Sequence, residues 1–240
     1  MRGRPPGRPH VGQYSEPLQA VRSCCDKIHR LPDPSGVFEV DFLTALRVHI
    51  GTHHSIYASV PPQGIYFEAL VEKAFRTVKK PYTVIEGTSR NQPTHDLLVE
   101  KKRLSLKTET GLGTHSDRIT ITKLCTTERE PWTAEILVDR VLEHLERYDI
   151  ILMLRAIWNL PLIRYDLLEI PVATLKLIRS AAFHPVGKRK VKQSIGAEVF
   201  AGEEKLFHVH FDASDGKCSI RNLPIRNCAL LLTWEIKIRD

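Results

Sequence analysis

The stretch that decides the fold covers residues 95–111 and reads HDLLVEKKRLSLKTETG. Two short runs rich in β-forming residues, 96–101 and 104–110, predict the strands of a β-hairpin. Asp96 stands at the start of the first run, and Lys107 and Glu109 lie two residues apart on the second. Two adjacent strands with this content can bring an acid, an amine and a second acid to one edge of a sheet.

Alternation along the second predicted strand divides its side chains between two faces. Ser105, Lys107 and Glu109 share one face, because side chains two residues apart on a strand point the same way. One interpretation is an exposed hairpin with surface salt bridges. The other is a chemical site, in which carboxylates hold Mg²⁺ and a lysine orients a water molecule or stabilises negative charge.

Helix and strand patterns alternate on both sides of the hairpin. Helical spacing of apolar residues predicts helices over 19–30, 38–50, 63–79, 133–147 and 172–180. Strand patterns predict strands over 118–124, 149–157 and 162–170, and three or four more from 190 to the end. This order predicts an α/β fold, with a mixed central β-sheet flanked by helices and a β-rich C-terminal part.

The length of 240 residues fits one large domain, or one domain with an appendage. The first residues, MRGRPPGRP, are rich in arginine, proline and glycine, so we expect a disordered basic tail over 1–15. A single domain is expected over 16–240. It divides into a helical part over 16–90, an α/β core over 91–185 and a β-rich part over 186–240.

Charge and cysteine content indicate the partner and the compartment. The net charge of +7 favours a polyanion as partner, with nucleic acid first. Five cysteines without a CxxC pair indicate reduced thiols, so we expect a cytoplasmic protein. No apolar run is long enough to cross a bilayer and the basic start has no apolar core behind it, so we expect no membrane association.

The helix predicted just before the hairpin carries Glu68 at the border of its apolar stripe. At 100° per residue, Glu68 lies next to Phe75 at the edge of that stripe, whereas Glu72 points further outward. A border position suits a group that lines a cleft. The alternative is a solvated glutamate stabilised by the helix dipole.

Basic residues near the C-terminus are candidates for nucleic-acid contacts. The segment GKRKVKQ, 187–193, is the densest cluster outside the tail, and its cations would neutralise phosphates: Lys188, Arg189, Lys190 and Lys192. Alternatively, it is a solubilising turn. Base edges are read by arginine and amide side chains, for which the candidates are Arg221, Asn222 and Arg226.

Histidines provide a further possibility for a metal site. His208 and His210 share a face of one predicted strand and could bind a metal with a third ligand. A simpler interpretation places them as surface or partly buried residues without a ligand.

The predicted strand pair resembles the catalytic strands of the PD-(D/E)xK nucleases, in particular the type II restriction endonucleases. Their pattern is an aspartate on one strand, then an acid, any residue and a lysine on the next. Asp96 and Lys107 match this pattern, whereas Ser105 stands where the acid normally stands. The resemblance implies that Asp96 and Glu109 bind Mg²⁺ and that Lys107 orients or activates a water molecule. It also implies that Glu68 assists from its helix.

The resemblance further implies a Mg²⁺-dependent endonuclease that cuts double-stranded DNA at a specific sequence. Cutting both strands needs two active sites, which favours a symmetric homodimer. Ser105 leaves open an alternative, a non-catalytic DNA-binding protein with a degenerate nuclease fold. A nuclease acting on RNA or branched DNA is a third interpretation.

Overall fold

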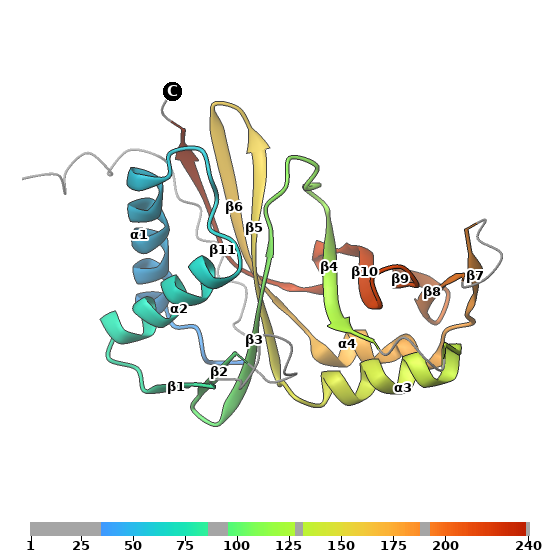
Figure 1. Ribbon diagram of the computed structural model, residues 1–240. Coiled ribbons are helices and arrows are strands. Elements are labelled where there is room, and N and C mark those ends of the chain that lie inside the picture. Colours follow the sequence, from blue (N-terminus) through green and yellow to red (C-terminus); the bar gives the residue numbers. More distant parts are fainter. Residues whose placement is uncertain (1–34, 86–95, 128–131, 188–192, 239–240) are drawn as a thin grey trace, which may run out of the picture.

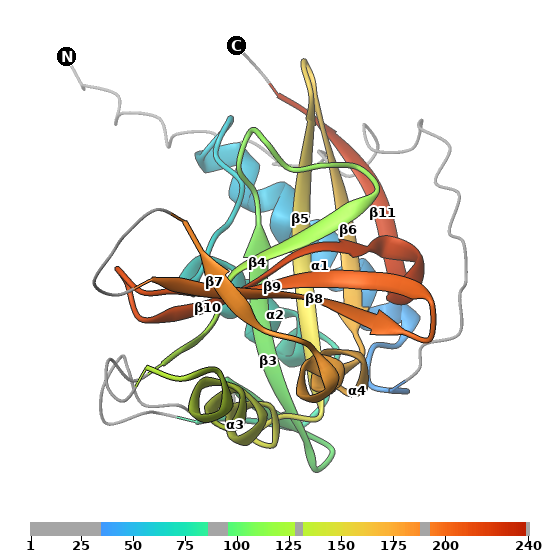
Figure 2. The same ribbon diagram turned by 90° about the vertical axis from the view of Figure 1, so that its right-hand side faces the viewer.

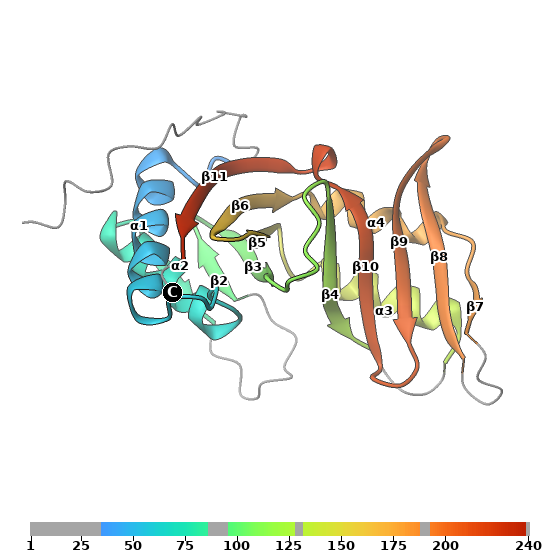
Figure 3. The same cartoon turned by 90° about the horizontal axis from the view of Figure 1, so that it is seen from above.

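The computed structural model describes residues 35–85, 96–127, 132–187 and 193–238, which form two β-sheets with helices against them (Figure 1). One sheet has six strands, in the order β1-β2-β3-β5-β6-β11, and the other has five, in the order β4-β10-β9-β8-β7. Figure 3 shows the sheets side by side, with α1 and α2 beyond the first of them. The predicted fold class, a mixed sheet flanked by helices with a β-rich C-terminal part, is confirmed.

The element bounds follow the chain order. The first half contains α1 Val40–Ile56, α2 Ile65–Thr77, β1 Tyr82–Val84, β2 Leu97–Val99, β3 Lys102–Glu109, β4 Arg118–Thr126 and α3 Ala134–Leu145. The second half contains β5 Ile150–Asn159, β6 Leu162–Ile170, α4 Val172–Lys176, β7 His184–Val186, β8 Ser194–Ala201, β9 Glu204–Asp212, β10 Lys217–Pro224 and β11 Ala229–Lys237. Two short 3₁₀ turns, Leu177–Ser180 and Ile225–Asn227, complete the described elements.

The predicted hairpin is formed by β2 and β3, which pair antiparallel. Its turn consists of Glu100 and Lys101, both with positive φ, at 48° and 68°. A two-residue loop with both residues in this conformation matches the right-handed twist of the strands on either side. Val99 therefore pairs directly with Lys102, and the register of β3 is set from there.

Beyond the hairpin, no described strand pairs with one edge of β3, which we call its open edge. β2 pairs with β3 only as far as Leu104, whereas β3 continues to Glu109 and pairs on its other side with the parallel strand β5. Edge amides without a strand partner need another acceptor. This open edge is where the candidate site lies.

Two apolar clusters hold the layers together. Helices α1 and α2 cover one face of the six-stranded sheet, where their aromatic residues meet apolar side chains of β3, β5 and β6, with Phe42, Phe75, Leu104, Leu152 and Tyr165 among them. Helix α3 and the five-stranded sheet cover the other face. In Figure 2 the strands of the second sheet run across those of the first. The faces of β3 follow the predicted alternation, because Leu104 and Leu106 belong to the α1–α2 side.

Several elements differ from the expectation or extend it. Helix α1 continues to Ile56, one and a half turns past the predicted end, because Phe42, Leu46, Ile50 and His53 keep a buried face. The short strands β1 and β7 were not predicted, since three residues carry too little pattern. The predicted helix over 19–30 and the predicted tail over 1–15 lie outside the described residues.

The last strand, β11, leaves the β-rich part and pairs with β6 in the six-stranded sheet. Residues 186–240 therefore contribute to both sheets, and the division of the chain at residue 186 stays a prediction. Among the described residues, no helix is both long and apolar enough to cross a membrane.

Candidate active site

Asp96 is held against the open edge of β3. The Leu106 amide donates to Asp96 Oδ2 at 2.5 Å, and the Asp96 amide donates to the Leu104 carbonyl at 2.8 Å. The carboxylate thus supplies the acceptor that the missing strand partner would have provided. Its position is fixed directly beside the backbone of Lys107.

Lys107 lies half-buried on β3, where it pairs in register with Met153 of β5. No acid within the described part of the chain forms an ion pair with it. Its charge nevertheless acts on two neighbours. It opposes part of the rise that burial and Asp96 cause in the pKa of Glu68, and it adds to the effect of burial in lowering the pKa of His144. An ammonium group without a fixed acid partner is available to a ligand.

Glu68 approaches this pair from the first turn of α2. Burial raises the pKa of its carboxyl, and the nearby charge of Asp96 raises that pKa further. Among the described residues, Glu68 has neither an ion pair nor a hydrogen bond from its side chain. A half-buried carboxylate near another acid is destabilised in its charged form. Lys107 offsets only part of this effect at Glu68, and a bound cation would offset more of it.

Glu109 is engaged elsewhere. Arg155 Nε donates to Glu109 Oε2 at 2.6 Å, and the Thr120 amide donates to Glu109 Oε1 at 3.0 Å. Burial raises the pKa of Glu109, although the guanidinium of Arg155 acts in the opposite direction. Both carboxylate oxygens therefore have protein partners. The structure brings Glu68, Asp96 and Lys107 into electrostatic contact and ties Glu109 to Arg155.

Ser105 takes the position where the resembled pattern has an acid, and it is buried at 2 % exposure, paired in register with Ile151. The described residues contain no group of three or more histidine, cysteine, aspartate or glutamate side chains able to hold a metal. Mg²⁺ needs only one or two carboxylates, because it keeps several waters and binds substrate phosphates. Asp96 and Glu68 fit that requirement.

The residues predicted to contact DNA are placed only in part. Arg221 and Asn222 are exposed on β10, and Arg226 follows it, with an ion pair to Glu204 at 2.8 Å. Arg221 pairs in register with His208, on the face of the five-stranded sheet opposite the core residues Phe207 and Val209. Lys188, Arg189, Lys190 and Lys192 lie outside the described residues.

His208 and His210 also lie on this outer face, with their rings 6.2 Å apart. Glu198 contacts His208 Nδ1 at 3.3 Å. Two histidines and one acid are present, but no described group of this kind is able to hold a metal.

Two residues near the site were missed at the level of sequence. Arg155 interrupts the apolar run of β5, and a lone arginine in a fully buried strand indicates a buried acid partner. His144 ends the amphipathic helix α3, and its Nε2 lies 3.1 Å from the Leu124 carbonyl. No pattern in the sequence indicates that this histidine meets Lys107.

His144 makes the stability of the fold depend on pH. Burial, then the charge of Lys107, lowers its pKa from the ordinary 6.5 to about 4. Between those values the unfolded chain binds a proton that the folded chain does not. The contribution of neutral His144 to the free energy of unfolding is therefore fully present above pH 6.5 and is lost as the pH falls towards 4. We expect this residue to account for about 2–3 kcal/mol of that loss.

The measurement is the free energy of unfolding by urea at pH 7.0 and at pH 4.5, for the wild type and His144→Gln. The variant should show a smaller difference between the two pH values. Equal differences would contradict the assignment. Because other titrating groups are common to both proteins, the comparison isolates the contribution of His144.

Comparisons with known proteins concern nearly the whole chain. A family model described as SmaI, type II site-specific deoxyribonuclease, matches residues 19–236. The type II restriction enzyme SmaI of Serratia marcescens is 28 % identical to the chain over 205 residues, which cover 83 % of this chain and 81 % of that enzyme. No solved structure matches. The matched range includes Glu68, Asp96, Lys107 and Glu109.

Proposed function

The chain belongs to the SmaI family of type II site-specific deoxyribonucleases, and from this premise we propose that it cuts double-stranded DNA at a specific sequence in a Mg²⁺-dependent reaction. The observation that carries the proposal is the geometry at the open edge of β3. There the Leu106 amide fixes Asp96 beside Lys107, and the half-buried carboxyl of Glu68 lies close enough for the charges of both to act on its pKa.

Asp96 and Glu68 are the residues that would hold the metal. A Mg²⁺ ion bound there supplies positive charge that polarises a phosphoryl oxygen and makes water a stronger acid. The raised pKa of Glu68 supports this pairing, because burial first and the charge of Asp96 second disfavour the ionised carboxyl, and a bound cation would stabilise it. The role of Glu109 as a metal ligand stays a prediction, and its ion pair with Arg155 favours Glu68 instead.

Lys107 acts on the reacting groups. Its ammonium donates hydrogen bonds to the attacking water, or to the phosphoryl oxygens on which negative charge develops. The lack of an acid partner among the described residues supports this role, because a fixed ion pair would have to break first. Ser105 is compatible with the scheme, since Glu68 supplies the second carboxylate from α2.

DNA contacts and assembly complete the proposal. Arg221 and Asn222 are exposed and available to DNA, and Arg226 would exchange its exposed ion pair with Glu204 for a DNA contact. The lysines and arginine within 188–192 would add phosphate contacts. Two copies of the chain would cut the two strands as a symmetric homodimer. The resemblance to PD-(D/E)xK nucleases supports the choice of Asp96 and Lys107.

Cleavage of plasmid DNA tests the function. With Mg²⁺ we expect discrete linear fragments whose ends map to one short sequence, and with a chelator in place of Mg²⁺ we expect intact plasmid. DNA binding that is weakened by salt, is indifferent to Mg²⁺ and leads to no cutting would favour the non-catalytic alternative. Cutting of RNA or branched DNA without cutting of duplex plasmid would favour the third interpretation.

A further inference from the structure

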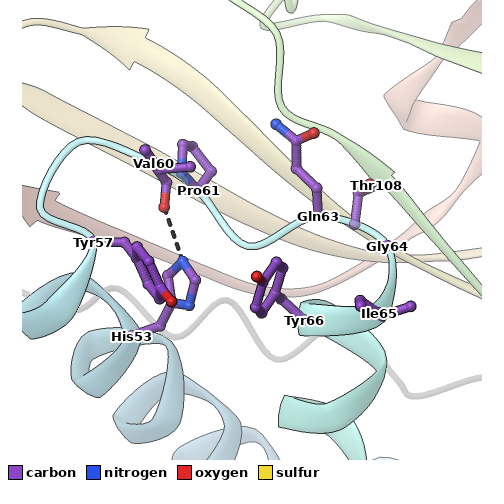
Figure 4. Close-up of a pocket in the computed structure, with 9 residues that line it drawn as sticks. All are labelled: His53, Tyr57, Val60, Pro61, Gln63, Gly64, Ile65, Tyr66 and Thr108. Carbon is purple, nitrogen blue, oxygen red and sulfur yellow. Dashed lines mark hydrogen bonds between the residues drawn. The ribbon is translucent and has the colours of Figure 1, made fainter.

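An exposed apolar surface lies where α1 ends and α2 begins. We call it the interhelix patch and define it by five side chains that are 44–72 % exposed: Ile56, Tyr57, Val60, Ile65 and Tyr66. Four of these residues, Tyr57, Val60, Ile65 and Tyr66, line a cavity of about 600 Å³. Figure 4 shows the rings of Tyr57, His53 and Tyr66 in a row below the loop that carries Val60 and Pro61. Contiguous exposed apolar surface of this kind marks a contact with another molecule.

The patch lies in a stretch without formal charge. Between Arg47 and Glu68 the chain has 20 residues with no lysine, arginine, aspartate or glutamate, although such residues make up 26 % of the whole sequence. Burial does not explain this lack of charged residues, because every residue from Ser55 to Val60 is exposed. The exposed positions of this stretch, among them the whole run 55–60 and residues 63–66, are thus all occupied by uncharged residues, which indicates that charge is excluded from this surface.

The lack of charge discriminates between the two possible macromolecular partners. A surface that binds DNA is strongly positive, because phosphates are contacted by lysine and arginine. The centre of a protein–protein interface is instead depleted in charged residues and enriched in aromatic ones. The interhelix patch, with two exposed tyrosines and no cation, has the second composition.

A second copy of the chain is the partner that fits the patch. Two molecules that each carry a net charge of +7 repel one another, and they approach at least cost through an uncharged surface. In a two-fold symmetric contact the same patch faces itself, so its members must be compatible with their own copies. Uncharged aliphatic and aromatic side chains meet that condition.

The position of the patch suits an enzyme with two active sites. Ile65 is the first residue of α2, whose first turn carries Glu68. The same cavity is lined by Thr108, the residue that follows Lys107 on β3. A symmetric contact here would set the two candidate sites near one two-fold axis, where they could reach the two strands of one duplex. We propose that the interhelix patch is the contact surface of a homodimer, an inference that rests on the proposed cutting of both strands.

Sedimentation velocity over a range of protein concentrations tests the surface. Ile65→Asp places a charge at the centre of the patch, in the first turn of a helix where an acid is tolerated. We expect its dimerisation to be weaker than that of the wild type by at least about thirtyfold, the size of a hot-spot loss. The matched control is Phe200→Asp, another exposed apolar residue (46 %) on the five-stranded sheet, which should dimerise like the wild type.

Activity and DNA binding give independent readouts. With supercoiled plasmid and Mg²⁺, the wild type should produce linear DNA, whereas Ile65→Asp should accumulate nicked circles. A wild type that is monomeric with and without DNA would overturn the proposal. An Ile65→Asp variant that stays dimeric would also overturn the proposal, whatever its affinity for a fluorescent duplex. If that dimeric variant binds DNA more weakly than the wild type, the patch faces DNA instead. If the wild type and Phe200→Asp dimerise, Ile65→Asp does not, and the wild type cuts no DNA, the proposed function fails and the interface stands.

Discussion

Glu68→Gln is expected to lower the rate of plasmid cleavage by at least about a hundredfold, since even groups behind a metal ligand cause losses approaching that size. The folded protein should not be weakened, because glutamine removes a carboxylate that burial and Asp96 already disfavour in its charged form. Loss of cutting with an equal or higher melting temperature would therefore place Glu68 at the metal.

Two variants provide the comparison for Glu68. Glu72→Gln changes the next acid on α2, which pairs with Arg76 at 4.0 Å on the helix surface, and it should cut like the wild type. Lys107→Ala should lose about 10²–10⁴-fold in rate while retaining DNA binding, as expected for a group that acts on proton transfer. Equal cutting by wild type and Lys107→Ala would reject the role of this lysine.

Glu109→Gln tests which acid, Glu68 or Glu109, supplies the carboxylate that the nuclease pattern expects at the position of Ser105. We expect the folded fraction to cut at the wild-type rate within about threefold, because Glu109 is bound to Arg155 and Thr120. Its melting temperature should fall. If instead Glu109→Gln is inactive but stable and Glu68→Gln is active, Glu109 is the carboxylate that binds the metal together with Asp96.

Arg155→Met is expected to destabilise the fold by about 3–5 kcal/mol, the cost of breaking a buried ion pair by removing one partner. Arg155 is completely buried and donates to Glu109, to the His115 carbonyl and, at 2.7 Å, to the Arg118 carbonyl. It thus ties the start of β4 in one sheet to β3 and β5 in the other. Its removal leaves Glu109 buried without its cation.

Urea unfolding of a double variant checks this explanation. Arg155→Met combined with Glu109→Gln should recover part of the lost free energy, because the unpaired carboxylate is gone. Asp166, 3.9 Å from Arg155 Nη1, keeps the Thr233 hydroxyl and Arg164 as partners and is less affected. The role of Arg155 would be contradicted if the free energy of unfolding of Arg155→Met lay within about 1 kcal/mol of the wild-type value. It would also be contradicted if the double variant lost the sum of the two single losses.

Local pattern was enough to predict much of the fold. The hairpin of β2 and β3, the amphipathic helices α2 and α3 and the strand β6 appear within a few residues of their predicted bounds. Each combines a clear apolar period with a terminating signal, and such elements are determined by short-range sequence. The shared face of Lys107 and Glu109 followed from the period of two along a strand.

The residues of the candidate site were proposed from the sequence. Which of them lie together depends on contacts between residues that are far apart in the sequence. Glu68 and Asp96 are 28 positions apart, and their proximity arises only when α2 packs beside β3. Glu109 seemed free in sequence because its partner, Arg155, lies 46 positions further along in another strand. Neither relation has a local signature.

The sequence by itself determined the helical and strand periods, the hairpin with its acid and lysine, and the family to which the chain belongs. These features depend on the order of residues along the chain. Only the tertiary structure decided that β11 returns to the first sheet, that Asp96 satisfies the open edge of β3, and that Arg155 takes Glu109 while Glu68 stays unpaired among the described residues. The physical reason is that a buried charge takes the partner that packing brings within reach. Packing in turn is set by the assembly of all layers of the fold.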